Sequence, residues 1–319
     1  MTYETTNIAI IGDLHYCSEI GSRLDNIPQT CMDKIQDIAK ECNILIFLGD
    51  VFERASMPFT DLVPFYLFLK KLKDSGKRLI TILGNHDIYN EREDSLYSTS
   101  LGWLYITGIM EIILPDKPMK LQLGDTQLCF HTTYVRYKKA LQHLPTIQLQ
   151  SDCDNILLLH HLFEEYPIIN GIPIDYINPS FKAVFLGHEH NPFGYKEING
   201  IKFFRSGSLL RNKADSYNLD RIPYCFMVSC SPQGRNIFAY TSEVAKPGSE
   251  IFTTEAYNQK NLKKKILIKS IDEIVDRYKY KITDDSKFFI KPVLVKLGID
   301  EWSLSYLAEK YNKVGAVFE

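Results

Sequence analysis

Short apolar runs alternate with amphipathic segments through the first half of the chain. Three largely apolar runs, typical of strands buried on both faces, lie at residues 7–11, 44–48 and 79–83, with Asn7 and Thr81 as their polar positions. Residues 28–42 and 61–73 lie between these runs and repeat apolar positions at helical spacing. The order strand, helix, strand, helix, strand predicts a largely parallel sheet that is covered by helices.

The second half of the chain carries further apolar runs, and few helical segments separate the last of them. These predicted strands lie at residues 128–131, 156–160, 183–186, 202–205, 225–228 and 237–240. Strands that follow one another without a crossover helix pair antiparallel, so we expect mixed sheets. Residues 241–249 contain Pro247-Gly248 and are predicted to be a linker.

A small C-terminal domain is predicted after this linker. It begins with a lysine-rich strand and continues as helix, strand and helix, at residues 263–268, 271–278, 293–297 and 302–311. Charge also changes here: residues 260–319 hold 13 basic and 9 acidic side chains, whereas residues 1–259 hold 24 basic and 30 acidic ones. The whole chain carries a net charge of -2, so any contact with a nucleic-acid backbone is expected at the basic C-terminal segment.

Composition limits the class of protein. Hydrophobic residues make up 45% and charged residues 24%, which excludes a disordered chain. No apolar run approaches the roughly 20 residues of a membrane helix, and residues 1–6 do not resemble a signal peptide. The seven cysteines form no Cys-x-x-Cys pair, which disfavours a disulfide framework or a zinc ribbon. We therefore expect a cytoplasmic protein without membrane contact.

Side chains of metal-binding type follow five of the predicted strands. They stand in the segments Asp13-Leu14-His15, Gly49-Asp50, Gly84-Asn85-His86-Asp87, His160-His161 and Gly187-His188-Glu189-His190. Residues i and i+2 of an extended segment point the same way, so Asp13 and His15 can reach one ion, and His188 and His190 have the same spacing. Each segment alone is equally a turn or a cap. Their joint occurrence, with six of the eight histidines, predicts a metal site.

The ligand types narrow the choice of cofactor. A mixture of carboxylate, amide and imidazole groups suits manganese, iron or zinc better than magnesium or calcium alone. The set is large enough for two divalent ions that share one bridging carboxylate. Two ions about 3.5–4 Å apart can clamp a phosphoryl group. We expect two manganese ions, with iron, zinc or magnesium as alternatives.

The ordered motifs resemble those of the calcineurin-like metallophosphoesterase superfamily, over residues 8–208. Within it, Gly84-Asn85-His86-Asp87 and Arg205-Ser206-Gly207-Ser208 resemble the DNA-repair nucleases of the SbcD and meiotic recombination eleven type, including their phage counterparts. The resemblance implies an α/β fold, a sandwich of two mixed β-sheets flanked by helices. It places the catalytic domain at residues 1–245 and a small α+β domain at residues 250–319. The small domain would cap the site, bind DNA or dock a partner.

The resemblance also implies the role of each site residue. The first metal would be bound by Asp13, His15, Asp50 and His190. The second would be bound by Asp50, Asn85, His160 and His188, so that Asp50 is the bridge. His86 would protonate the leaving oxygen or stabilise the transition state, and Asp87 would hold the His86 ring. A hydroxide bridging the metals would be the nucleophile, and His160 is preferred to His161 because it comes first after its strand.

Other positions near the motifs leave alternatives open. Glu53 stands where the repair nucleases commonly have histidine, which leaves strand polarity and the choice between exonuclease and endonuclease open. Leu83 stands where related protein phosphatases have arginine, which counts against a phosphatase. Arg54, Arg205 and Arg211 are candidates for binding phosphate oxygens, with solvation or ion pairing as the alternative for each.

We therefore predict a metal-dependent hydrolase that acts as a DNA nuclease in repair or recombination. A phosphatase or small-nucleotide phosphodiesterase on the same scaffold is the alternative. A scaffold without activity is disfavoured because every ligand position and His86 are present. By resemblance, the expected partners are DNA, an SMC-like coiled-coil ATPase of the SbcC type, and a second copy of the chain.

Overall fold

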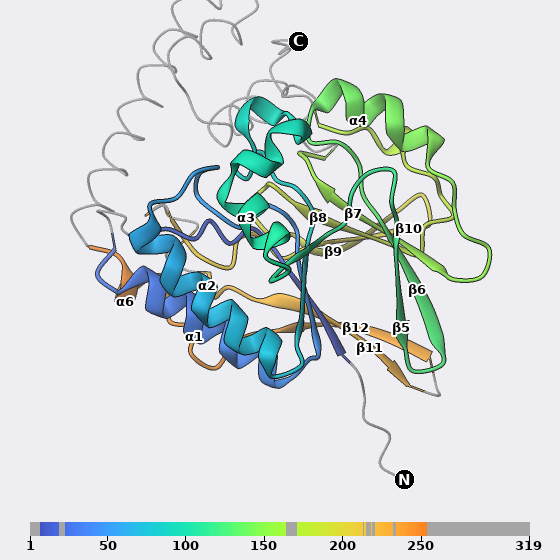
Figure 1. Ribbon diagram of the computed structural model, residues 1–319. Helices are drawn as coiled ribbons and strands as arrows, with labels where there is room; N and C mark the ends of the chain where they lie inside the picture. The colour runs from blue at the N-terminus through green and yellow to red at the C-terminus, as the bar shows by residue number, and fades with distance from the viewer. Residues whose placement is uncertain are drawn as a thin grey trace, which may run out of the picture.

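The computed structural model describes residues 7–18, 23–163, 171–212, 214, 218, 221–231 and 234–253. Two six-stranded sheets face each other in this part of the chain, and helices lie on their outer faces (Figure 1). The predicted sandwich of two mixed sheets flanked by helices is confirmed. The small domain expected from residue 250 lies outside the described residues, apart from its first four positions.

The first sheet has the strand order β12-β11-β1-β2-β3-β4. Its strands are β1 (Asn7–Ile11), β2 (Ile44–Phe47), β3 (Arg78–Thr81), β4 (Glu111–Ile112), β11 (Cys225–Ser231) and β12 (Gly234–Tyr240). Strands β1 to β4 are parallel, whereas β11 runs antiparallel to β1 and β12 runs antiparallel to β11. The carboxyl ends of β1, β2 and β3 therefore meet at one edge of this sheet.

The second sheet has the strand order β5-β6-β7-β8-β10-β9. Its strands are β5 (Met119–Leu123), β6 (Thr126–His131), β7 (Asp154–His160), β8 (Ala183–Gly187), β9 (Gly194–Ile198) and β10 (Ile201–Arg205). Strands β6, β7, β8 and β10 are parallel, and the outer strands β5 and β9 are antiparallel to their neighbours. The last residues of β7 and β8, His160 and Gly187, pair directly, so their following segments start side by side.

Helices cover the outer faces of both sheets. They are α1 (Ile27–Lys40), α2 (Phe59–Asp74), α3 (Ser100–Ile106), α4 (Tyr137–His143) and α6 (Gly248–Ile251), with short 3₁₀ turns η1 (Tyr89–Glu91), η2 (Glu93–Ser98), η3 (Leu144–Thr146) and η5 (Ile174–Tyr176). Helix α1 begins after Asn26, whose side chain accepts a hydrogen bond from the Gln29 N–H and so caps the helix. No helix among the described residues is long and apolar enough to span a membrane.

Burial on both faces of the first sheet explains why the runs that form its strands are largely apolar. In β1, Ile8 and Ile10 pack toward the second sheet, where they join Phe130 and Leu158. Ala9 and Ile11 point to the opposite face and pack with residues of the covering helices. Because neither face meets water, no polar position interrupts the strand, and the polar residues begin only where it ends.

The predicted linker at residues 241–249 is attached to helix α1 instead of spanning open solvent. The buried carboxylate of Asp37 accepts hydrogen bonds from the Ser242 hydroxyl and the Glu243 N–H, both at 2.8 Å. Pro247-Gly248 marks the start of the short helix α6. The turn-forming composition indicates a break between elements, but the partner on α1 lies some 200 positions away in the sequence and could not be inferred from the local pattern.

Candidate metal centre

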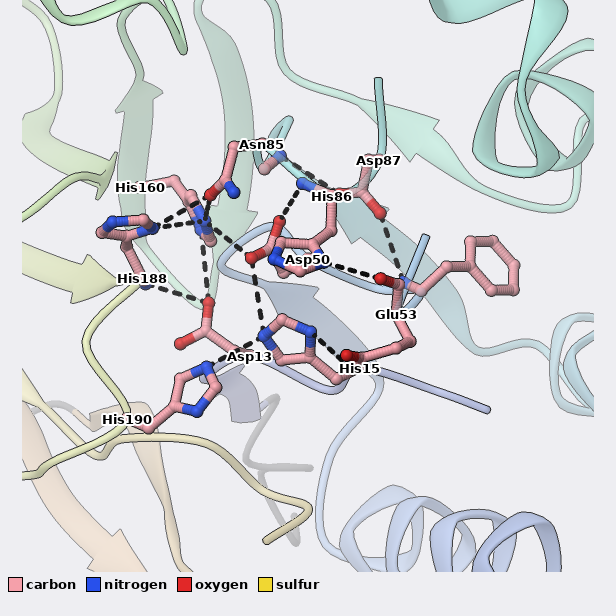
Figure 2. A network of polar contacts seen from close by, with 12 residues as sticks. Asp13, His15, Asp50, Glu53, Asn85, His86, Asp87, His160, His188 and His190 are labelled. Carbon is pink, nitrogen blue, oxygen red and sulfur yellow. Dashed lines mark hydrogen bonds and ion pairs between the residues drawn. The ribbon is translucent and has the colours of Figure 1, made fainter. Parts of the chain in front are cut away.

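The predicted metal ligands converge where the carboxyl ends of both sheets meet (Figure 2). Asp13 and His15 follow β1, Asp50 follows β2, and Asn85 follows β3, whereas His160 ends β7 and His188 and His190 follow β8. Open α/β sheets form their sites at this end of the strands. The seven side chains thus come from segments up to 177 positions apart and still face one another.

Backbone contacts hold the first two ligand segments together. The carbonyl of Asp50 accepts hydrogen bonds from the N–H groups of Leu14 at 3.1 Å and His15 at 2.8 Å. His15, Asp50 and His188 all adopt left-handed backbone, with φ of 48°, 46° and 74°. This conformation is uncommon outside glycine and costs free energy, so the surrounding contacts must enforce it. Strain concentrated at three ligands is typical of a functional site.

Gly84 is required by the position of Asp50. A Cβ atom at Gly84 would lie 2.1 Å from Oδ1 of Asp50, which is an impossible contact with a buried group. The same Oδ1 accepts a hydrogen bond from the His86 N–H at 2.8 Å. The loops after β2 and β3 therefore lock together, and the Gly-Asn-His-Asp segment has to begin with glycine.

Asp50 lies between the two groups of ligands. Its Oδ2 is 3.1 Å from Nε2 of His160 and 3.5 Å from Nε2 of His15. On one side, Oδ1 of Asn85 lies 3.1 Å from Nε2 of His160 and 3.0 Å from Nδ1 of His188. On the other side, Nε2 of His15 faces Nε2 of His190 at 2.9 Å. This is the arrangement that a bridging carboxylate between two ions requires.

The donor atoms fit divalent ions. Two pairs of imidazole nitrogens face each other at hydrogen-bond distance, in His15 with His190 and in His160 with His188. Nitrogen atoms that face each other this closely are also arranged to share a cation. Oδ2 of the buried Asp13 has no hydrogen-bond partner among the described residues, although an unsatisfied buried carboxylate oxygen is costly. Residues of the centre fall into groups whose ligand atoms lie within 4.8 Å of one another.

Burial and charge set the protonation of this cluster when no ion is bound. Burial disfavours the charged form of His160, but the facing Asp50 carboxylate outweighs it and raises the pKa of His160 to about 10. Burial, together with the positive His160, lowers the pKa of His188 to about 3. Burial raises the pKa of Asp13. Because an imidazole must lose its proton to bind a metal, binding of an ion at His160 would release a proton.

His160, rather than the adjacent His161, faces the centre. Nδ1 of His160 lies 2.7 Å from the Leu48 carbonyl and donates to it, which leaves Nε2 directed at Asp50 and Asn85. The ring of His161 turns away, and its Nε2 lies 2.7 Å from the Tyr134 carbonyl. Burial lowers the pKa of His161 to about 4. This placement agrees with the preference for the first histidine after the strand.

His86 lies beside the ligands, at the edge of a cleft of about 460 Å³. Its Nδ1 donates to the Glu53 carbonyl at 2.6 Å, so Nε2 is the nitrogen left for a substrate. Asp87 does not hold this ring as expected. The buried Asp87 carboxylate accepts hydrogen bonds from the N–H groups of Gly84 at 3.1 Å and Phe52 at 3.2 Å, and so ties the loops after β2 and β3 together. Burial and the nearby Asp50 raise the pKa of Asp87 to about 7.

Glu53 has a larger role than the sequence indicates. Its Oε2 lies 3.1 Å from Nδ1 of His15, and its main-chain carbonyl accepts the hydrogen bond from His86. The amide of Asn212 donates to the same Oε2 at 3.1 Å and to the His15 carbonyl at 3.2 Å. Glu53 therefore orients the rings of His15 and His86 together. Glu53 could be noticed in the sequence because the repair nucleases commonly have histidine at its position. No sequence signal points to Asn212.

The segment after β10 closes the centre beside Asp13. The Leu209 N–H donates to the Asp13 carbonyl at 2.9 Å, and the buried amine of Lys34 donates to the Leu209 carbonyl at 3.2 Å. Arg211 is 1% exposed, and its guanidinium donates to the carbonyls of Asn218, Arg221 and Lys246. Arg211 thus holds this segment in place, which corresponds to neither the phosphate contact nor the solvated or ion-paired alternative considered for it.

The other two candidate arginines lie in different environments. Arg205 is buried at the end of β10, with its guanidinium 4.3 Å from the centroid of the Phe193 ring. This position also differs from that of a phosphate-binding arginine. Arg54 is exposed and lines the cleft beside His86. Of the three arginines, Arg54 alone is placed where a substrate could reach it.

Comparison with known proteins identifies a family. A family model described as calcineurin-like phosphoesterase matches residues 6–192. A comparison with curated protein sequences finds no match.

Similar solved structures include GAP50, the anchor in the inner membrane complex of Plasmodium, with 13% identity over 76% of this chain and 86% of that chain at a TM-score of 0.44. A dimetal phosphatase from Danio rerio has 10% identity over 75% of this chain and 99% of its own, also at a TM-score of 0.44. A predicted phosphoesterase from Streptococcus pneumoniae has 14% identity over 75% of this chain and all of its own, at a TM-score of 0.32.

Proposed function

Because the chain belongs to the calcineurin-like phosphoesterase family, we propose that it is a two-metal-dependent DNA nuclease that hydrolyses phosphodiester bonds. The observation that carries this proposal is the position of His86, between the bridging Asp50 and an open cleft. The alcohol that leaves during hydrolysis needs space beside a proton donor, and this cleft offers that space next to His86. Leu83, in the position where protein phosphatases have arginine, and the basic residues 260–296 support the same proposal.

Each residue of the centre has a part in the proposed reaction. When bound, the two ions would activate water and withdraw charge from the phosphoryl oxygens. Asp13, His15 and His190 would hold one ion, Asn85, His160 and His188 the other, and Asp50 both. Nε2 of His86 would donate a proton to the leaving oxygen, since Nδ1 is already bound to the Glu53 carbonyl. Glu53 keeps the His15 and His86 rings in position during this step.

The first experiment separates a nuclease from a phosphatase or small-nucleotide phosphodiesterase. The full chain is incubated with manganese, iron, zinc or magnesium and given a labelled single-stranded DNA, a cyclic nucleotide or p-nitrophenyl phosphate. We expect cleavage of the DNA, most rapidly with manganese, and loss of cleavage when a chelator is added. Hydrolysis confined to the phosphomonoester or to the cyclic nucleotide would replace the nuclease with the corresponding alternative.

A homodimer is part of the proposal, and an apolar surface on helix α2 supports it. Phe59, Val63 and Leu67 follow one another at a spacing of four residues and are 75%, 40% and 57% exposed. Residues at this spacing share one face of a helix. Tyr66 packs against Trp103 of α3 at a ring distance of 4.6 Å. An exposed apolar surface of this kind is typical of a protein interface.

The dimer is tested by measuring mass in solution. We expect light scattering coupled to size-exclusion chromatography to give twice the chain mass of 36.9 kDa, and Leu67→Glu to give the monomer mass. Lys138→Glu, on the exposed side of α4, is the matched control and should remain a dimer. A wild-type protein that stays monomeric at micromolar concentration would contradict this assignment. Purification of the tagged chain from its native source, with identification of accompanying proteins, tests the proposed SMC-like ATPase partner.

A further inference from the structure

The cleft beside His86 has the composition of a nucleotide-binding subsite. It is formed by the loops after β2 and β3, and Asn85 and His86 make up its wall toward the metal centre. Its volume of about 460 Å³ is within the range of pockets that bind small molecules. Because His86, the proposed proton donor to the leaving oxygen, lies on this wall, a group in the cleft would belong to the leaving side of the phosphate. We call this space the His86 cleft, lined by Arg54, Ser56, Asn85, His86, Tyr89 and Asn90.

Tyr89 brings an aromatic side chain to this cleft from a fixed loop. Tyr89 is among the residues that line the cleft, and it is 42% exposed. The Tyr89 N–H donates to the Ser95 hydroxyl at 2.9 Å, and that hydroxyl donates to the Arg92 carbonyl at 2.6 Å. Asn90 and Glu91 both adopt left-handed backbone, with φ of 53° and 55°. Two consecutive residues in this costly conformation indicate that the position of Tyr89 is enforced.

Arg54 supplies positive charge at the same cleft. Its guanidinium is exposed and makes no ion pair with any residue in the described part of the chain. A free arginine can bind a phosphate group with two parallel hydrogen bonds. An aromatic ring together with a cation is the combination that binds single-stranded nucleic acid, through a stacked base and its phosphate.

We propose that the His86 cleft binds the first nucleotide on the leaving side of the scissile bond. Its base stacks on the Tyr89 ring, and Arg54 binds the next phosphate. This proposal rests on the proposed nuclease function and adds the substrate class: a single-stranded segment, since the base must be unstacked from its neighbours to reach Tyr89. Stacking on one ring accepts every base, so the subsite selects strand state and not sequence.

The test combines variants of Tyr89 with abasic substrates. Single-stranded oligonucleotides carry one abasic nucleotide at successive positions, and cleavage at each bond is measured with the wild-type chain, Tyr89→Ala and Tyr89→Phe. With the wild type, a missing base directly on the leaving side should raise KM by about 5- to 100-fold. Tyr89→Ala should raise KM for the intact strand by the same factor. The abasic nucleotide should raise the KM of this variant no further. Tyr89→Phe, which keeps the ring, should match the wild type.

Binding gives a second readout that does not depend on turnover. Fluorescence anisotropy with a labelled oligonucleotide, measured in calcium, reports affinity. Tyr89→Ala and Arg54→Ala should both bind the oligonucleotide more weakly than the wild type. Tyr97→Ala removes an exposed tyrosine outside the cleft and should change neither measurement. If the wild type cleaves DNA and Tyr89→Ala behaves identically on intact and abasic strands, the subsite is wrong while the nuclease stands. If the wild type neither binds nor cleaves DNA, the nuclease and the subsite fall together.

Discussion

Asp50→Ala is expected to remove both metal ions and with them all hydrolysis. Oδ2 of Asp50 lies between His160 and His15, the nearest ligands on the two sides of the centre. Its loss deprives each ion of a negative charge and leaves buried imidazoles as the main ligands. Activity on any substrate should fall by at least about a thousandfold, since the ions are expected to supply several kcal/mol of transition-state stabilisation.

The measurement for Asp50→Ala is metal content together with activity. Bound metal per chain is determined by mass spectrometry after dialysis, and affinity by calorimetric titration of the metal-free protein with manganese. In the metal-free protein, the Asp50 carboxylate raises the pKa of His160 to about 10. The pKa of His160 should therefore fall in Asp50→Ala. Asp61→Ala, on the outer helix α2, should retain full metal content. Two tightly bound ions in Asp50→Ala would show that Asp50 is not the bridge.

The ligands could be predicted from sequence because each depends on local structure. A buried strand ends where apolar residues give way to polar ones, and parallel strands bring those ends to one edge. The strand pattern is therefore sufficient to place Asp13, Asp50 and Asn85 together. The choice of His160 over His161 comes from the resemblance, which places a single histidine directly after the strand, and the hydrogen bond from His160 to the Leu48 carbonyl supplies its physical basis.

The contacts that support the ligands could not be predicted in this way. Asn212 donates to Glu53 across 159 sequence positions, and no pattern near either residue indicates the pairing. The position of Arg211 after a motif leaves a phosphate contact and a solvated or ion-paired side chain open, but its guanidinium donates to buried main-chain carbonyls instead. The resemblance predicts that Asp87 orients His86, yet its carboxylate binds the backbone N–H groups of Gly84 and Phe52. Long-range packing decides such details, and a single sequence does not record it.

His86→Ala is expected to keep both ions and lose cleavage. The hydrogen bond from His86 to Asp50 comes from the main-chain N–H, which alanine retains, so the ligand arrangement should survive. Removing the proton donor should lower kcat on DNA by about 10²–10⁴-fold. The loss should be much smaller for bis(p-nitrophenyl) phosphate, because p-nitrophenolate is a stable anion that leaves without protonation. This difference between leaving groups distinguishes proton donation from any general damage to the site.

Metal content and two substrates together decide the role of His86. His143→Ala, on α4 and outside the centre, is the matched control and should leave both rates unchanged. Retained DNA cleavage by His86→Ala would refute a catalytic role. An equal loss on both substrates, with two ions still bound, would assign His86 to stabilising charge on the transition state, because only proton donation depends on the basicity of the leaving oxygen. The larger loss on DNA that we expect would place Nε2 of His86 at that oxygen, on the side of the phosphate where the cleft opens.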